Sequence, residues 1–195
     1  MSEEVRFECT RCGRCCIELR PVIVLRDIEL WLSKRRWDLV ALLEKRVSYS
    51  LGRMLGVMYC YTFAGDGPCP FYEDGKCLIY SIRPLVCRLF PFAYSSRRAA
   101  FHPWALENCP GVGRGRPFTE SEVKAVRALA RLIVRELVAL PYYDELVEDV
   151  IRAARRRLRG VVVGEGCGSG GEDALSRGFR GVEHAGRIKG EVRKE

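Results

Sequence analysis

The cysteines near the amino terminus are the residues whose type and spacing could do chemistry. Four of them, Cys9, Cys12, Cys15 and Cys16, lie within eight positions of the 195-residue chain. Gaps of two residues let a tight loop turn successive thiolates towards one centre, and Gly13 removes a steric obstacle to that turn. Disulfides between such close neighbours would be strained, which argues against a disulfide framework. Soft thiolate ligands select zinc, copper(I) or an iron–sulfur cluster.

Four more cysteines complete the candidate set of metal ligands: Cys69, Cys77, Cys87 and Cys109. The amino-terminal triplet with two-residue gaps matches bacterial ferredoxins, whose fourth ligand is a cysteine followed by proline. Leu19 stands where that cysteine would be, whereas Cys69 and Cys109 both precede a proline. Zinc sites more often pair two Cys-x-x-Cys motifs, and the second half of this chain has none. The spacing favours a [4Fe–4S] cluster over zinc, and it leaves open whether there is one centre or two.

A short proline-bounded helix is predicted around Cys87. Pro84 suits the first turn of a helix and Pro91 ends it, so Cys87 would lie near the positive end of the helix dipole, which favours a thiolate. Arg83 and Arg88 flank this cysteine and could offset the negative charge of a thiolate cluster. The alternative is that both are surface arginines on an ordinary short helix.

Taken in order, these motifs resemble the YkgJ-type CxxCxxCC cysteine-cluster family of zinc- or iron-chelating domains. The resemblance covers about residues 5–112 and implies a metal-chelating protein. Its cysteines fall on Cys9, Cys12, Cys15, Cys16, Cys69, Cys77, Cys87 and Cys109. Cys60 and Cys167 lie outside the pattern. We expect Cys60 to be a small core residue and Cys167 to bind no metal.

The same resemblance adds an enzyme to the candidate functions. Relatives of the family include the flagellin lysine N-methylases, for which an iron–sulfur cluster is reported, so a protein lysine methyltransferase dependent on S-adenosylmethionine is an alternative. The glycine-rich segment 161–171 resembles the first motif of such enzymes, but only 24 residues follow it, too few for the required parallel sheet. A linker is the better interpretation of this segment, and whether the protein is an enzyme stays open.

The first half of the chain alternates short elements with turns. Asp27 is a candidate N-cap for a helix over 28–34, and 37–47 is predicted to continue as a second helical piece. Residues 57–63 are β-branched and aromatic, which is typical of a strand. Turns are predicted at 64–68 and 73–76.

The second half is predicted to be helical. Thr119 and Glu122 form a capping box, after which apolar residues recur at helical spacing up to Pro141. These apolar residues are Val123, Val126, Leu129, Ile133, Leu137 and Leu140. A second helix is predicted over 142–159, with Gly160 as its stop. Its apolar face would comprise Leu146, Val147, Val150, Ile151, Ala154 and Leu158.

These elements predict an α+β fold in which a small cysteine-rich, metal-centred domain with short strands precedes two long packed helices. One domain would occupy residues 1–159, and 160–195 would form a flexible tail, since ten of the 19 glycines lie there. The tail is electrically neutral, so the net charge of +8 belongs to 1–159.

The composition limits which cellular location and which binding partners we expect. The chain begins without a signal peptide and has no apolar run long enough to cross a membrane, which predicts a cytoplasmic protein and no membrane partner. Arginine outnumbers lysine 27 to 6 and glutamine is lacking, a bias that thermophiles share. Basic stripes on the two long helices make nucleic acid a candidate partner, but solvated helix faces explain them better. An unidentified protein partner fits electron transfer or a partner-assisted reaction.

Overall fold

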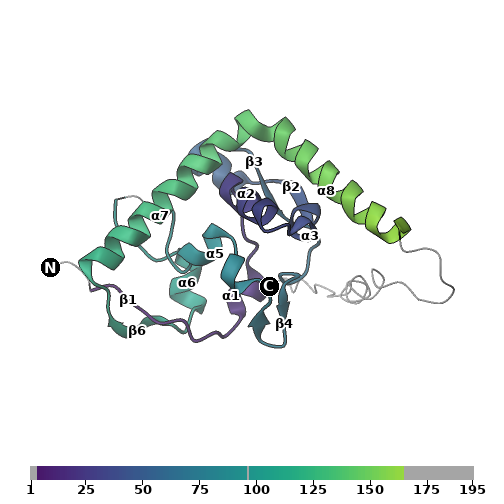
Figure 1. The fold of residues 1–195 in the computed structure, drawn as a ribbon. Helices are drawn as coiled ribbons and strands as arrows, with labels where there is room; N and C mark the ends of the chain where they lie inside the picture. Colours follow the sequence, from purple (N-terminus) through teal and green to yellow (C-terminus); the bar gives the residue numbers. More distant parts are fainter. Residues whose placement is uncertain (1–3, 96, 165–195) are drawn as a thin grey trace, which may run out of the picture.

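The computed structural model describes residues 4–95 and 97–164. In this part of the chain, short helices and strands form a body against which two long helices lie, meeting at an elbow (Figure 1). The helices are α1 (Arg14–Glu18), α2 (Leu25–Ser33), α3 (Trp37–Ala41), α4 (Tyr49–Leu55), α5 (Leu85–Leu89), α6 (Pro103–Asn108), α7 (Glu120–Ala139) and α8 (Asp144–Gly164), with 3-10 turns η1 (Tyr80–Ile82) and η2 (Leu140–Tyr143). The strands are β1 (Arg6–Phe7), β2 (Leu43–Val47), β3 (Tyr59–Phe63), β4 (Tyr72–Glu73), β5 (Lys76–Cys77) and β6 (Val112–Pro117).

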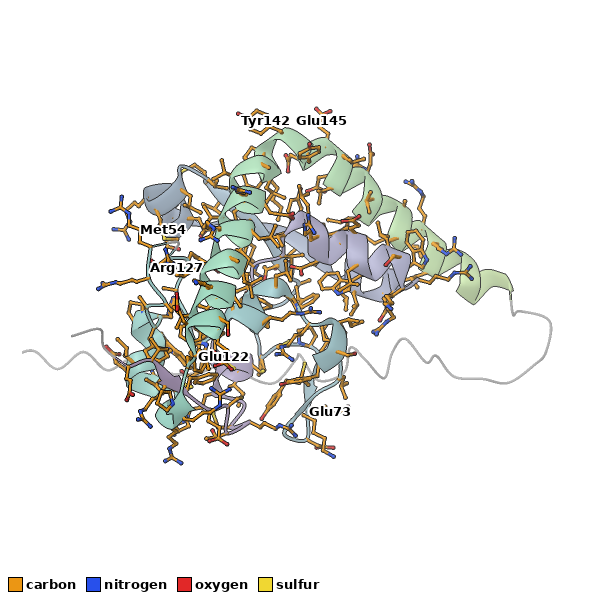
Figure 2. The ribbon with its side chains drawn as sticks, turned by 60° about the vertical axis from the view of Figure 1, so that its left-hand side comes forward. Met54, Glu73, Glu122, Arg127, Tyr142 and Glu145 are labelled. Carbon is orange, nitrogen blue, oxygen red and sulfur yellow. The ribbon has the colours of Figure 1, made fainter. Side chains whose placement is uncertain are left out.

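The predicted α+β class is confirmed. The described strands pair antiparallel in three separate two-stranded sheets, β1 with β6, β2 with β3, and β4 with β5. The turn predicted at 73–76 is the tip of the β4–β5 hairpin, where Asp74 and Gly75 both have positive φ, as a tight two-residue turn requires. Glu73 marks this tip, which projects away from α8 (Figure 2).

The helix predicted over 37–47 is wrong in its second half. α3 ends at Ala41, and residues 43–47 form β2, in which Leu43 pairs with Phe63 and Val47 with Tyr59. Local apolar spacing favoured a helix, but β3 offers these residues a strand partner and a buried position for Leu43. Cross-strand pairing of this kind overrides local preference.

The start of the preceding helix also differs from expectation. α2 begins at Leu25, so Asp27 lies in its first turn and is not the N-cap. The Asp27 carboxylate instead accepts a hydrogen bond from the backbone N–H of Val24 at 3.1 Å. Asp27 therefore satisfies a free N–H at the helix start from inside the helix.

The two long helices follow the prediction at their beginning and depart from it at their end. Thr119 and Glu122 form the predicted capping box, with backbone N–H donors bonded reciprocally at 3.3 and 2.8 Å. α7 ends before Pro141, which lies in η2. α8 runs past Gly160 to Gly164, so the predicted stop is wrong. A helix interior accepts a glycine at a cost of about 1 kcal/mol, and backbone hydrogen bonding can continue beyond it.

The main core lies between α2, α3, the β2–β3 sheet and α8. Trp31 is fully buried there, stacked on Phe63 with ring centroids 5.6 Å apart, and its indole N–H donates to the carbonyl oxygen of Ile82 at 2.8 Å. Phe71, just after Cys69, packs edge-on against Phe63 at 4.9 Å. The aromatic cluster thus ties the cysteine-bearing segment to the core.

A second hydrophobic cluster lies under α7 and includes Leu51, Leu89, Ile133 and Leu137. Cys60 is buried in it, as expected of a core residue. The two long helices therefore pack against different elements, α7 against α5 and α8 against α3.

The predicted apolar face of α8 is partly exposed near the start of the helix, at the elbow. Val147, Ile151 and Ala154 are buried as predicted, whereas Leu146 is exposed. Tyr142 is also exposed and lies at the elbow, on the outside of the molecule (Figure 2). In the part of the chain that the structure describes, no helix is long and apolar enough to cross a membrane. Cys167 and residues 165–195, most of the predicted tail, lie outside the described residues.

Candidate metal centre

The cysteines of the predicted set come from segments that the fold brings to one region, between α1, α5, α6 and the β4–β5 hairpin (Figure 1). A backbone hydrogen bond joins the amino-terminal cysteine segment to the segment that begins at Cys69. The N–H of Cys69 donates to the carbonyl oxygen of Cys16 at 2.7 Å. Tyr72 and Cys77 then pair across the hairpin. Residues separated by more than fifty positions in the chain are thereby neighbours.

An inner group of thiols comprises Cys69, Cys77 and Cys87, with Cys15 beside it. Burial is the first cause that raises the pKa of Cys87, and the neighbouring Cys69 and Cys15 raise it further. Burial likewise raises the pKa of Cys69. Burial thus acts on Cys87 in the direction opposite to the effect expected from its place at the start of α5, because it penalises the charged thiolate.

An outer group forms where the amino-terminal loop meets the segment after α6. The N–H of Glu8 donates to the carbonyl oxygen of Gly111 at 3.1 Å, and the Arg14 guanidinium donates to that of Asn108 at 3.2 Å. A Cβ at Gly111 would stand 2.2 Å from the Glu8 carbonyl oxygen, so only glycine permits this approach. The two joints place Cys109 beside the loop that carries Cys12.

The neighbours of Cys109 confirm that placement. Burial raises the pKa of Cys109, and the nearby thiols of Cys12 and Cys15 raise it further. Cys9 directly follows the residue bonded to Gly111, and both Cys9 and Cys12 are exposed. Cys12 and Cys109 thus form an outer group, to which we add Cys9 because it lies on the same loop, and Cys9 and Cys12 lie nearer to solvent than the inner thiols.

Cys15 and Cys16 stand between the two groups. Their side chains are hydrogen-bonded to each other, and this bond is the first cause of a strongly raised pKa for Cys15, followed by burial. Cys15 neighbours Cys69 and Cys87 on one side and Cys109 on the other. Cys15 therefore lies between the two groups, with Cys16 beside it.

The chemistry of the donors fits a thiophilic metal. Crowded, half-buried thiols resist losing their protons, and a bound cation reverses this by taking the place of those protons. Among residues 4–95 and 97–164, no three His, Cys, Asp or Glu side chains already stand in a metal-coordinating arrangement. The cysteines are thus gathered as neighbours, and the donor set that they offer is soft thiolate.

The loop that carries Cys9 and Cys12 packs closely against the β4–β5 hairpin at Gly13. Gly13 has a φ of +74°, and a Cβ there would stand 1.7 Å from the phenol oxygen of Tyr72 and 2.2 Å from its ring carbon Cζ. Tyr72 lies on the hairpin between Cys69 and Cys77, and its N–H donates to the Cys69 carbonyl oxygen at 3.0 Å. This close approach seats the amino-terminal loop against the hairpin.

Two positioning residues were missed by sequence reasoning. The buried Asp27 carboxylate accepts a second hydrogen bond, from the N–H of Leu85 at 2.9 Å, which ties the start of α5 to α2. Burial raises the pKa of Asp27 to about 6 despite these bonds. Arg20 donates to the carbonyl oxygens of Phe63 and Gly67, both at 3.2 Å, and so holds the bend that leads to Cys69. The local sequence gives no sign of these three contacts, since the partners lie 43 to 58 positions away.

Arg83 and Arg88, predicted to lie beside the metal, make their hydrogen bonds to the η1 turn. Arg83 lies over the Tyr80 ring at 3.8 Å and donates to the Tyr80 carbonyl oxygen. Arg88 donates to the carbonyl oxygens of Arg83 and Ser81, both at 3.1 Å. They brace the turn that leads into α5, and a direct role of either at the metal stays a prediction.

Part of the predicted basic surface has a structural use. Arg155 on α8 donates to the carbonyl oxygens of Ala41 and Leu43 at 2.9 and 2.7 Å, which joins α8 to the start of β2. Arg157 lies over the Trp37 ring at 5.0 Å. These contacts favour the interpretation of the arginine-rich helix as a packed and solvated face.

Comparison with known proteins agrees with this gathering of thiols. Residues 8–110 match the CxxCxxCC family, described as a putative zinc- or iron-chelating domain, and this is more than half of the chain. The chain belongs to this family. It is a metal-binding cysteine-cluster protein, and the match spans all eight predicted ligands from Cys9 to Cys109.

An uncharacterized protein of Methanocaldococcus jannaschii is also similar, at 24% identity over 165 residues, which cover 79% of this chain and 81% of that protein. No solved structure matches this chain.

Proposed function

We propose that the protein carries a [4Fe–4S] cluster on Cys9, Cys12, Cys15 and Cys109. The proposal is supported by a cysteine followed by proline that lies near two members of the amino-terminal triplet. Cys109 neighbours Cys12 and Cys15, as the fourth ligand of a ferredoxin-like triplet must. Leu19 at the local position is thereby replaced by a residue about ninety positions further along the chain.

The proposed role is one-electron transfer to or from a protein partner, either on its own account or within a reaction that the partner carries out. A [4Fe–4S] cluster supplies a one-electron redox couple whose potential depends on hydrogen bonds to its sulfurs and on solvent exposure. Cys9 and Cys12 are exposed, so a cluster held by them lies near the surface, where a partner can approach. Arg14, bonded to the Asn108 carbonyl oxygen, would keep positive charge close to the thiolates.

The test is anaerobic purification followed by iron and sulfide analysis and absorption spectroscopy. We expect brown protein that absorbs near about 400 nm and holds about four iron and four sulfide per chain in the outer centre. Cys109→Ser should remove most of the absorption, whereas Cys60→Ser, a buried cysteine outside the set, should keep it. Colourless protein that contains only zinc would contradict the proposal.

A further inference from the structure

We propose that two copies of the chain associate at the elbow, with α8 of each copy lying antiparallel to α8 of the other in the groove between α2 and α8. The residues that line this groove include none of the eight candidate metal ligands. The association is therefore independent of the metal that the cysteines hold.

A groove of about 500 Å³ lies between α2 and the first half of α8. The Arg26–Glu136 ion pair, at 3.1 Å, lies on its polar edge. Its apolar lining residues are Leu25, Ile28 and Leu32 on α2 and Leu146, Val147 and Val150 on α8. On each helix these residues recur every three or four positions, so each helix lines the groove with one face. An apolar channel between two helix faces is suited to receive a third helix.

The groove is open to solvent in the single chain. Leu146 is 59% exposed and Tyr143 is 48% exposed, although both line it. Apolar side chains that lie together in water and are edged by polar groups mark an interaction surface. Val147, beside Leu146, is buried in the main core. A helix that covered Leu146 would thus extend the main core across the contact.

The charge along α8 indicates that this helix comes from a second copy. All four acidic residues of α8 precede position 151, and all five of its arginines follow it. Glu145 and Arg156 are exposed, and Glu145 lies on the outside of the elbow (Figure 2). Two antiparallel α8 helices place the acidic half of each beside the basic half of the other, so the surface is complementary to itself. Self-complementarity is what a two-fold symmetric dimer requires.

The apolar stripe of α8 sets the register of this contact. Leu146, Val150 and Ala153 are spaced by four and three positions, so they follow one another along one face of the helix. A two-fold axis near Val150 places Leu146 opposite Ala153 of the partner subunit, where the small side chain leaves room for the large one. The same axis brings Glu145 within reach of Arg156 of the partner subunit.

The experiment measures the mass of anaerobically purified full-length protein by sedimentation between about 1 and 100 µM, where we expect a monomer–dimer equilibrium. Leu146→Glu places a charge in the groove of both copies, so it should raise the dissociation constant at least about tenfold. Met54→Glu is the matched control, because Met54 is 53% exposed on α4 and does not line the groove. It should change the dissociation constant by less than about twofold.

Charge reversal tests the antiparallel arrangement. Glu145→Arg and Arg156→Glu should each raise the dissociation constant about fivefold, because each sets like charges against each other across the contact. The two changes combined in one chain should bring it back to within about twofold of the unaltered protein. Both side chains are exposed, so these variants keep the core of the single chain intact.

Three results would overturn the two-fold contact: a monomer at about 100 µM, a dimer that Leu146→Glu leaves unchanged, or charge reversals without recovery. The iron and sulfide content should be the same in all these variants. Failure of the dimer therefore leaves the cluster proposal standing, and failure of the cluster leaves the dimer standing.

Discussion

Replacing Gly13 by alanine should destabilise the protein more than the same change at any other glycine of similar conformation. Two effects act together at Gly13. Its φ of +74° lies in the left-handed region, and its Cβ would overlap the Tyr72 ring, with contacts of 1.7 Å to the phenol oxygen and 2.2 Å to Cζ. Gly56 is a matched control, because its φ is +72° and nothing lies within 4 Å of the position of a Cβ.

The magnitudes follow from these two effects. A left-handed conformation costs a residue with a Cβ about 1–2 kcal/mol, so Gly56→Ala should lower the free energy of unfolding by about that amount. Forcing an extra methyl group into an occupied position costs a further 1–3 kcal/mol or so. Gly13→Ala should therefore lose about 2–5 kcal/mol, and its excess over Gly56→Ala measures the overlap with Tyr72.

The assay is urea unfolding of the anaerobically purified protein, repeated in a Tyr72→Ala background. Removing the ring removes the overlap, so in that background Gly13→Ala should cost no more than Gly56→Ala does. Metal content should fall with stability in Gly13→Ala, because the loop and the hairpin both carry ligands. Equal losses for the two glycines, or an excess that persists without the Tyr72 ring, would refute this account of how the loop is seated.

Two further predictions concern buried polar groups. The Asp27 carboxyl should titrate near pH 6 in carbon-13 NMR of the protein. Because burial raises its pKa, its contribution to the free energy of unfolding is largest below about pH 4 and is lost as the pH rises through 6. Titration near pH 4, with Asp27→Asn used to assign the resonance, would contradict this. Tyr61→Phe should lower the free energy of unfolding by about 1–3 kcal/mol, because the buried hydroxyl lies within hydrogen-bonding distance of two carboxylates on α8, at 2.6 and 3.0 Å. The exposed Tyr142→Phe should change it by less than about 0.5 kcal/mol in the same urea titration, and equal effects would count against the buried network.

Local signals predicted the elements whose stability is local. The capping box at Thr119 and Glu122 and the turn before Lys76 depend on side chains within three positions of one another, and both form as predicted. The helix expected over 37–47 failed because residues 43–47 obtain their backbone partners from β3. A pairing partner that lies far along the chain leaves no trace in the local pattern.

The same division applies to the candidate site. Spacing alone indicates which cysteines form the donor set, because two-residue gaps and Cys-Pro dipeptides are local features. The roles of Asp27 and Arg20 could not be read from the sequence, since each holds a main-chain group at least 43 positions away. Arg83 and Arg88 flank Cys87 in the sequence, whereas in the structure they donate hydrogen bonds at the η1 turn.

By itself, the sequence determined the chemistry of this protein, because eight cysteines in one ordered pattern and a family match over residues 8–110 define a soft, thiolate-rich metal-binding protein. Only the tertiary structure decided which thiols are neighbours. Cys109 meets the amino-terminal loop through the hydrogen bond between Glu8 and Gly111, and Cys69 meets Cys16 through another. The physical reason is that ligand type is a property of each residue, whereas ligand grouping depends on backbone contacts between segments 53 to 103 positions apart.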